Sequence, residues 1–290
     1  MMDMWNMATE EAMMPKNNLL IVDGLNLAFR YKHRGTTDFA ADYVKTVNSL
    51  AKSYHAREIV ILVDYKGSWF RKDLHPKYKF DRKAKFADQT EEEKLAAEQF
   101  FEDFNKAIEL CECNFHVIKL EGVEADDTAA YLVEEFEDTD DFDHIWLIST
   151  DKDWDELLGE KVSRFSYTTR KEYNLDNFYE YHQCDTPDEY TSIKAIMGDP
   201  GDSVYGVNGI GAKRAYNLVR QYGDALEIAT QLPIEGKQKY IEELNKSEEK
   251  LILNTQLVDL RSFHKEAIAF PSPENLLYLE QVCNNLRGAA

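Results

Sequence analysis

Short apolar runs alternate with amphipathic segments in the first half of the chain. Leu19–Val22, Ile59–Val63 and Ile145–Ile148 are short and rich in β-branched side chains, which favours buried parallel strands over helices. Apolar side chains between the first two runs recur at helical spacing, and they are Phe39, Tyr43, Val47, Leu50 and Tyr54. This alternation of strands and helices predicts an α/β domain with a mostly parallel sheet.

The segment from Tyr65 to about Thr90 has a different texture. Its basic side chains are Lys66, Arg71, Lys72, Lys77, Lys79, Arg82, Lys83 and Lys85. Aromatic side chains are interleaved with them, namely Trp69, Phe70, Tyr78, Phe80 and Phe86. Thr90 and Glu93 then form a capping pair that predicts a helix start. A long basic and aromatic excursion after a strand predicts a functional loop or lid, and a solvated surface loop is the alternative.

Beyond residue 183 the pattern becomes helical with a glycine-rich interruption. Thr186–Glu189 places a capping pair and a proline at a helix start, and the helix should run to Met197. The glycines that follow predict two turns, and they are Gly198, Gly201, Gly206, Gly209 and Gly211. A second helix should begin near Ala212. This helix–turn–turn–helix unit opens a smaller all-helical region, in which the acidic tail from Leu232 carries no predicted chemistry.

Composition is typical of a globular protein, with 43% hydrophobic and 30% charged residues. No apolar run approaches the roughly 20 residues that cross a bilayer. The start, MMDMWNMATEEAMM, lacks the basic region and apolar core of a signal peptide. We therefore expect an intracellular protein whose residues 1–18 form a flexible extension.

Cysteine spacing supports that placement. The four cysteines are Cys111, Cys113, Cys184 and Cys283. They lack the spacing of a disulfide framework, which indicates reduced and buried thiols. Cys111 and Cys113 with His116 are a possible zinc site, but they match structural zinc spacings poorly.

Clustered carboxylates are the strongest chemical signal. Asp23 and Asp64 follow the first two apolar runs, and the carboxyl ends of parallel strands meet at one edge of a sheet. The other acidic groups are Glu124, Asp126 and Asp127 in GVEADD, Asp151 and Asp153 in ISTDKDWD, and Asp199 and Asp202 in GDPGD. Mg²⁺ and Mn²⁺ prefer carboxylate oxygens, and two such ions about 4 Å apart can catalyse phosphodiester hydrolysis. Bound cations would also locally offset the net charge of −20, which otherwise opposes DNA binding.

Each acidic group also has an ordinary structural explanation. Asp153 could cap a helix at Trp154–Leu158, and Asp199 and Asp202 could be turn residues. Asp23 could form a surface turn, and the GVEADD acids could be a solvated helix start. Their joint convergence argues against these alternatives, because so many carboxylates at one pole would repel each other without cations.

Two segments carry groups suited to a phosphate backbone. In GVNGIGAKRA, Gly209 and Gly211 allow a tight turn whose amides point at a phosphate, and Lys213 and Arg214 add positive charge. Such contacts hold DNA without reading its sequence. The carbonyls of the turn are candidates for a monovalent cation such as K⁺, and a helical hairpin that merely needs glycine is the alternative.

The second segment is HPKYKFDRK. Lys79 and Arg82 are one helical turn apart, so both could face one phosphate and stabilise developing charge. Tyr78 could stack on an unpaired base, and Lys83 extends the same basic run toward DNA.

Three motifs in order, GVEADD, ISTDKDWD and GDxxxGVxGIGxKRA, with Asp23 and Asp64 upstream, resemble the flap endonuclease/5′-exonuclease family. That family includes the nuclease domain of bacterial DNA polymerase I and the stand-alone 5′-nucleases of tailed bacteriophages, to which the likeness is greatest. The resemblance implies an α/β fold with a PIN-like parallel-sheet nuclease core at 19–183. It further implies a helical arch at about 65–110. The remainder, 184–290, would be a helical region with a helix-hairpin-helix-type (helix–two/three-turn–helix) DNA clamp.

The resemblance also assigns roles. It implies a first metal cluster of Asp23, Asp64, Glu124, Asp126 and Asp127. It implies a second cluster of Asp151, Asp153, Asp199 and Asp202. Asp23 and Asp151 are the predicted catalytic carboxylates, Lys79 and Arg82 match the basic pair of the arch, and Tyr78 matches its base-stacking position. Lys194 and Lys213 match lysines that contact duplex DNA. Phe80 departs from the small residue usual at its position, which bears on the packing of the arch.

The function implied is two-metal-ion hydrolysis of DNA with 5′ flaps, 5′ overhangs or branched ends, in replication or repair, by a flap endonuclease and 5′-3′ exonuclease. Two or three Mg²⁺ or Mn²⁺ ions would serve it. We expect a monomer without a membrane partner, in the cytoplasm, of a host cell if the chain is phage-encoded. Two alternatives are a PIN-type nuclease acting on RNA and a non-catalytic protein that binds branched DNA. The glycine turn with Lys213 and Arg214 favours duplex DNA, and the intact acidic set favours catalysis.

Overall fold

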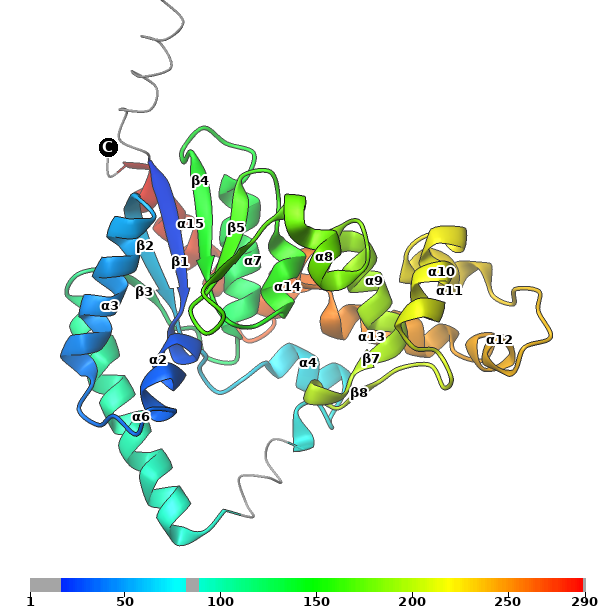
Figure 1. Ribbon diagram of the computed structural model, residues 1–290, viewed down its shortest axis with the longest axis horizontal. Helices are drawn as coiled ribbons and strands as arrows, with labels where there is room; N and C mark the ends of the chain where they lie inside the picture. The colour runs from blue at the N-terminus through cyan, green and yellow to red at the C-terminus, as the bar shows by residue number, and fades with distance from the viewer. Residues whose placement is uncertain (1–16, 82–88, 289–290) are drawn as a thin grey trace, which may run out of the picture.

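A six-stranded sheet forms the centre of the first half of the chain (Figure 1). The structure is a computed structural model that describes residues 17–81 and 89–288. The strands are β1 (Asn18–Asp23), β2 (Ala56–Leu62), β3 (His116–Ile118), β4 (His144–Ile148), β5 (Val162–Ser166) and β6 (Lys171–Tyr173). They lie in the order β3-β2-β1-β4-β5-β6, with β6 alone antiparallel to its neighbour. The predicted α/β class with a mostly parallel sheet is confirmed.

The three predicted strands are the central ones, β1, β2 and β4. Their register pairs Asp23 with Leu62 and Val22 with Ile148, so their carboxyl ends lie level at one edge. The other three strands were not predicted. β3 and β6 have only three residues each, and three of the five residues of β5 are polar, so none carries a long apolar run.

Helices cover both faces of the sheet. One face packs on α2 (Gly24–Lys32), α3 (Ala40–Ser53) and α6 (Glu91–Glu112). The other face packs on α7 (Ala125–Phe136), α14 (Leu260–Ala269) and α15 (Glu274–Gly288). Burial on both sides explains why the central strands are continuous apolar runs. The predicted amphipathic helix is α3, whose buried side includes Tyr43 and Val47.

The segment between β2 and α7 contains α4 (Trp69–Leu74), a turn at 75–79 and α6. Thr90 and Glu93 form the predicted capping box at the start of α6. In Figure 1 the first half of α6 projects beyond the sheet, while α4 lies beside α13. Arg82 and Lys83 lie outside the described residues, as does most of the predicted extension at 1–18, although Asn18 already begins β1.

The second half of the chain builds a helical region with its own apolar core. Its elements are α8 (Phe178–His182), α9 (Pro187–Met197), the β7–β8 hairpin (Gly198–Asp199 and Val204–Tyr205), α10 (Ala212–Tyr222), α11 (Ala225–Gln231), α12 (Lys239–Leu244) and α13 (Glu248–Val258). α9 ends at Met197 and α10 begins at Ala212, as predicted. Thr186 accepts a hydrogen bond from the Glu189 amide and starts α9.

The last two helices do not belong to that helical core. α14 and α15 return to the sheet, where Leu260, Ile268 and Leu279 join the cluster around α7. Residues after 259 therefore pack with the first half of the chain, although they follow the helical region in sequence. In the described part of the chain, no helix is both long enough and apolar enough to span a bilayer. Cys111, Cys184 and Cys283 are buried free thiols, whereas Cys113 is exposed.

Candidate active site

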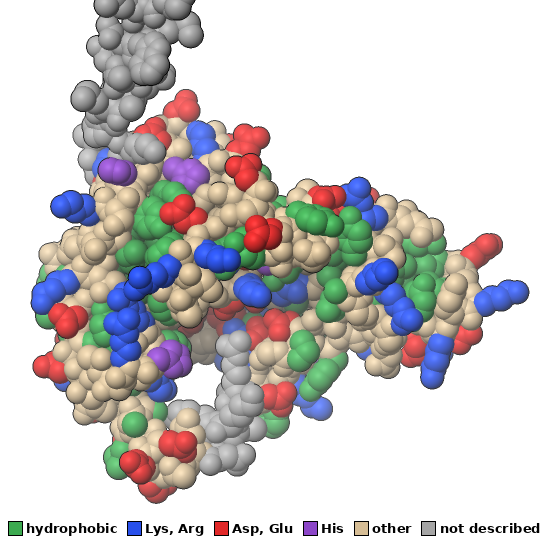
Figure 2. Space-filling view, viewed as in Figure 1, with side chains coloured by type: hydrophobic (Ala, Val, Ile, Leu, Met, Phe, Trp, Pro, Cys, Tyr) green, Lys and Arg blue, Asp and Glu red, His purple; other side chains and the backbone are tan. Residues whose placement is uncertain are grey.

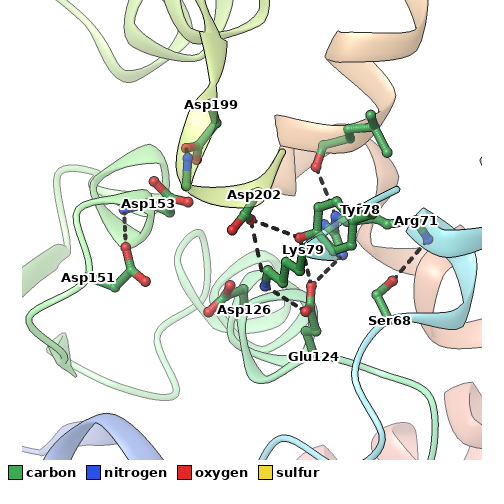
Figure 3. Close-up of polar contacts among 12 residues, drawn as sticks. Ser68, Arg71, Tyr78, Lys79, Glu124, Asp126, Asp151, Asp153, Asp199 and Asp202 are labelled. Atoms are coloured by element: carbon green, nitrogen blue, oxygen red, sulfur yellow. Dashed lines mark hydrogen bonds and ion pairs between the residues drawn. The ribbon is translucent and has the colours of Figure 1, made fainter. Parts of the chain in front are cut away.

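Carboxylates from five separate segments meet at the carboxyl edge of the sheet, and Figure 3 shows three of these segments, which carry Glu124 with Asp126, Asp151 with Asp153, and Asp199 with Asp202. We call this set the acidic pole; its members are Asp23, Asp64, Glu124, Asp126, Asp151, Asp153, Asp199 and Asp202. Asp23 ends β1, and its two oxygens accept from the Asn26 amide and the Ser149 hydroxyl at 3.0 and 2.9 Å. Asp64 follows β2 and accepts from the Ala125 amide at 2.7 Å. The first turn of α7 is thereby joined to the strand ends.

A second group bridges the sheet and the helical region. One oxygen each of Asp153, Asp199 and Asp202 lies within 4.8 Å of the others. Among residues 17–81 and 89–288, no other His, Cys, Asp or Glu side chains form such a group of three or more, so Cys111, Cys113 and His116 do not make a zinc site there. A divalent cation at about 2.0–2.6 Å from each ligand could be shared by oxygens at this separation.

The acidic pole has an excess of negative charge that Lys79 and Lys194 balance only in part. Burial, followed by the charge of Asp64, raises the pKa of Asp23 to about 8. Burial and Asp151 raise the pKa of Asp126 well above its ordinary value, and burial and Asp153 raise that of Asp151. Desolvation and Glu124 raise the pKa of Asp64, although part of its side chain is exposed. Mutual repulsion of this kind is relieved by a cation, which is the charge that a divalent metal ion would supply here.

Asp127 is an exception, and its prediction as a metal ligand is wrong for this arrangement. Its two carboxylate oxygens each accept a hydrogen bond at 2.7 Å from the guanidinium of Arg71. Both side chains are fully buried. Asp127 therefore neutralises an arginine inside the protein, and it was mistaken for a ligand because the sequence places it beside Asp126.

Lys79 lies inside the acidic pole. Its ammonium is 2.6 Å from Glu124 Oε1 and 3.6 Å from Asp202 Oδ2. Burial alone lowers the pKa of Lys79, but Glu124 raises it overall, so the ammonium stays protonated. Burial likewise raises the pKa of Glu124 by itself, whereas Lys79 and Arg71 lower it to about 2. Lys79 sits in a turn with φ of 55°, and Arg82 lies outside the described residues, so the predicted helical spacing of the two stays a prediction.

Tyr78 is buried in this structure, with 5% of its surface exposed. Its hydroxyl donates toward Glu124 Oε2 and Asp202 Oδ2 at 3.1 and 3.0 Å. A ring held this way cannot stack on a base, so the predicted stacking would require the turn at 75–79 to move.

Lys194 is also placed among carboxylates. Its ammonium lies 2.9 Å from Asp153 and 2.8 Å from Glu156. Burial raises the pKa of Glu156 to about 7. Lys194 thus serves as a counter-ion beside the second group of carboxylates, a position that sequence spacing alone did not predict.

The glycine turn presents a different surface. Gly209 has φ of 80°. Gly211 is the N-cap residue of α10 and has no side chain to accept hydrogen bonds from the first amides of the helix. Lys213 and Arg214 are exposed in the first turn of α10. The Arg214 guanidinium donates to the Gly209 carbonyl and covers the Tyr240 ring at 4.5 Å. Arg214 is therefore engaged with the turn itself.

Comparison with known proteins gives a consistent result over the whole fold. The profile of the 5′-3′ exonuclease N-terminal resolvase-like domain matches residues 18–183, and that of the 5′-3′ exonuclease C-terminal SAM fold matches 185–271. The chain is 53% identical over 261 residues to the flap endonuclease of Escherichia phage T5, covering 90% of this chain and 89% of that protein. The chain belongs to the flap endonuclease/5′-3′ exonuclease family.

Other members of the family agree. The 5′-3′ exonuclease of Bacillus subtilis (strain 168) is 31% identical over 226 residues, which cover 72% of each chain. The phage T5 flap endonuclease in a pseudo-enzyme–product complex with DNA and metal ions superposes with a TM-score of 0.90, 50% identity, and coverage of 93% of this chain and 99% of that one. The T5 5′-exonuclease with bound zinc ions gives 0.89 and 50%, covering 93% and 100%.

Within this flap endonuclease/5′-3′ exonuclease, the ordinary explanations for the acids are partly right. Asp23 caps α2, and Asp199 accepts from the Gly201 amide as a turn residue does. These bonds do not prevent either from facing the acidic pole. The capping explanation for Asp153 is wrong, since the residue before the 3₁₀ turn Asp153–Leu157 is Lys152 and no side chain caps it.

Several supporting residues escaped sequence reasoning. Ser149 donates to Asp23 and accepts from the Asp151 amide at 3.1 Å. Trp154 Nε1 donates to Asp126 at 2.6 Å. Arg164 donates twice to Asp155, at 2.6 and 2.8 Å. Both Ser149 and Trp154 lie within ISTDKDWD, so their closeness to the aspartates was a usable signal, whereas nothing in the sequence connects Arg164 to that loop.

One hollow of the surface gathers acidic side chains and is bordered by basic ones. Figure 2 shows Asp and Glu side chains in the hollow between the sheet and the helical region, with Lys and Arg side chains along its upper edge. A hollow of about 610 Å³ beside α2 is lined by Arg30, His33, Arg34 and Arg170. Local positive surfaces therefore exist on a chain whose net charge is −20.

Proposed function

We propose that this chain is a structure-specific 5′-nuclease that hydrolyses phosphodiester bonds in 5′-flapped or 5′-ended duplex DNA. The observation that carries the proposal is the position of Lys79, a protonated ammonium that contacts both groups of carboxylates in the acidic pole. A phosphodiester drawn to cations in this pole would lie within reach of that ammonium.

Asp23, Asp64, Glu124 and Asp126 would hold one divalent ion, and Asp151, Asp153, Asp199 and Asp202 a second. Bound Mg²⁺ or Mn²⁺ would supply Lewis acidity and activate water for attack on phosphorus. Lys79 leaves Glu124 for a non-bridging phosphate oxygen and stabilises the charge that develops there. Arg82 is proposed to assist it from the arch.

Duplex DNA would be held by the α9–turn–α10 unit, which we propose to be of the helix-hairpin-helix type. Exposed Lys213 and the amides before α10 contact phosphate oxygens, and Arg214 stabilises the turn through Gly209. The carbonyls of the turn are a proposed K⁺ site. The enzyme is proposed to act as a monomer.

Cleavage of a labelled 5′-flap duplex with Mg²⁺, with Mn²⁺ and with EDTA tests this function. We expect cutting near the flap junction that requires a divalent ion. Tight binding without cutting under any divalent metal would support a non-catalytic protein that binds branched DNA. Equal or faster cutting of a matched RNA flap would support the RNA nuclease.

A further inference from the structure

Arg71 occupies an unusual position for an arginine, because it is buried where three parts of the fold meet. It belongs to α4, and only 1% of its surface is exposed. Its Nη1 and Nη2 donate to the two oxygens of Asp127 on α7, and its Nε donates to the Leu257 carbonyl on α13 at 2.9 Å. Ser68 fixes the start of α4 by accepting from the Arg71 amide at 3.0 Å (Figure 3).

The same guanidinium reaches the acidic pole. Arg71 Nη1 lies 3.4 Å from Glu124 Oε2, the oxygen that also accepts from Tyr78. The other oxygen, Oε1, faces Lys79 at 2.6 Å. Figure 3 shows Arg71 on the side of Glu124 away from Asp151 and Asp153. Arg71 therefore helps to hold Glu124 so that Oε1 points into the acidic pole.

The contact with α13 extends this link into the helical region. Asn254 on α13 donates to the carbonyls of Ala195 in α9 and Tyr205 in β8, at 2.8 and 3.2 Å. Arg71 donates to Leu257 of α13, and Asn254 of the same helix holds the β7–β8 hairpin. Arg71 therefore connects Glu124 to the segment that carries Asp199 and Asp202. An uncompensated Asp127 would be costly at this depth, so the pair is an anchor as well as a link.

We propose that Arg71 is a positioning residue that orients Glu124 for metal binding and joins the two groups of carboxylates through α13, with Asp127 as its structural anchor. This inference rests on the nuclease function proposed above. Replacing a residue that hydrogen-bonds to a metal ligand generally lowers metal affinity or activity about 10–100-fold.

The test is Arg71→Lys, which keeps the charge but loses the planar fork that contacts Asp127 and Leu257 together. Arg287→Lys is the matched control, since Arg287 pairs with Glu135 at the opposite end of α7. Calorimetric titration with Mn²⁺ alone, without DNA, is the main readout, and thermal melting confirms folding. We expect Mn²⁺ affinity to fall about 10–100-fold in Arg71→Lys, with a lower kcat and a nearly unchanged KM for flap DNA, and no change in the control.

Wild-type Mn²⁺ affinity and kcat in folded Arg71→Lys would overturn the proposal. If that variant does not fold, Asp127→Asn replaces it, because an amide keeps the shape of Asp127 and one acceptor for Arg71. An anchor predicts that Asp127→Asn weakens Mn²⁺ binding without reducing the number of ions bound, and loss of a bound ion would show a direct ligand and overturn it. A wild-type chain that binds Mn²⁺ but never cuts DNA would instead refute the nuclease function.

Discussion

The ammonium of Lys79 lies 2.6 Å from Oε1 of Glu124, so a side chain from the segment before α6 enters the acidic pole. Clustered carboxylates repel each other unless a positive charge lies among them, and the Lys79 ammonium supplies such a charge. A bound metal ion would offer Glu124 a new partner, and a phosphate oxygen of the substrate would offer Lys79 one. The ion pair is thus well placed to exchange when substrate and metal bind.

Lys79→Ala should lower kcat for flap cleavage about 100- to 1000-fold, because one donor to the developing phosphate charge is lost. The Kd for flap DNA should change little, since most of the affinity comes from the duplex contacts. Single-turnover cleavage and binding in Ca²⁺ measure the two effects separately. Lys79→Arg serves as the control that keeps a positive charge. Equal rates for Lys79→Ala and wild type would remove Lys79 from the chemistry.

Asp151 and Asp155 are four residues apart and should respond in opposite ways to substitution. Asp151→Asn removes a repelled carboxylate, so the metal-free fold should keep its Tm while cleavage falls at least about 100-fold. Asp155→Ala leaves the buried Arg164 without its partner and should destabilise the fold by about 3 kcal/mol. Thermal melts beside cleavage assays distinguish the two. Full activity in Asp151→Asn would contradict its place in the second cluster.

The raised pKa of Asp23 predicts how the stability of the metal-free protein depends on pH. Its pKa is raised from 3.8 to about 8 on folding, so between these values the folded chain binds a proton that the unfolded chain releases. Stability from this group is therefore present at low pH and is lost as pH rises toward 8. We expect the Tm in EDTA to fall from pH 5.5 to 8.5, and Mg²⁺ to raise Tm most at the higher pH. Asp23→Asn should weaken this fall in Tm, and an unaltered profile would contradict the assignment.

Lys213 should affect binding and leave the chemistry unchanged. Lys213→Ala removes one exposed phosphate contact, so flap-duplex affinity should weaken and the slope of log affinity against log salt should fall by about 1. The cleavage rate with saturating DNA should stay at the wild-type value. Fluorescence anisotropy across a salt series measures the slope, with exposed Lys45 on α3 as the control position. A salt slope equal to that of the wild type would show that the duplex does not contact Lys213.

Much of this protein was predictable because its signals are local. Three apolar runs predicted the central strands, since strands buried on both faces must be apolar throughout. Capping pairs at Thr90 and Thr186 predicted where α6 and α9 begin, because a helix start depends on its own first turn. The position of Asp23 at a strand end placed it at the carboxyl edge once the sheet was known to be parallel.

Only the tertiary structure decided which residues that are adjacent in the sequence belong to the same site. Asp126 and Asp127 are adjacent in the chain, yet one lies in the acidic pole and the other is paired with Arg71. Successive helix residues point about 100° apart, so adjacency along α7 cannot show which carboxylate meets the pole. Arg71 and Lys194 likewise meet their partners across long sequence separations, and Arg164 meets Asp155 from the neighbouring strand β5. Sequence determines the local elements and their chemistry, whereas pairings between distant buried charges depend on how those elements pack.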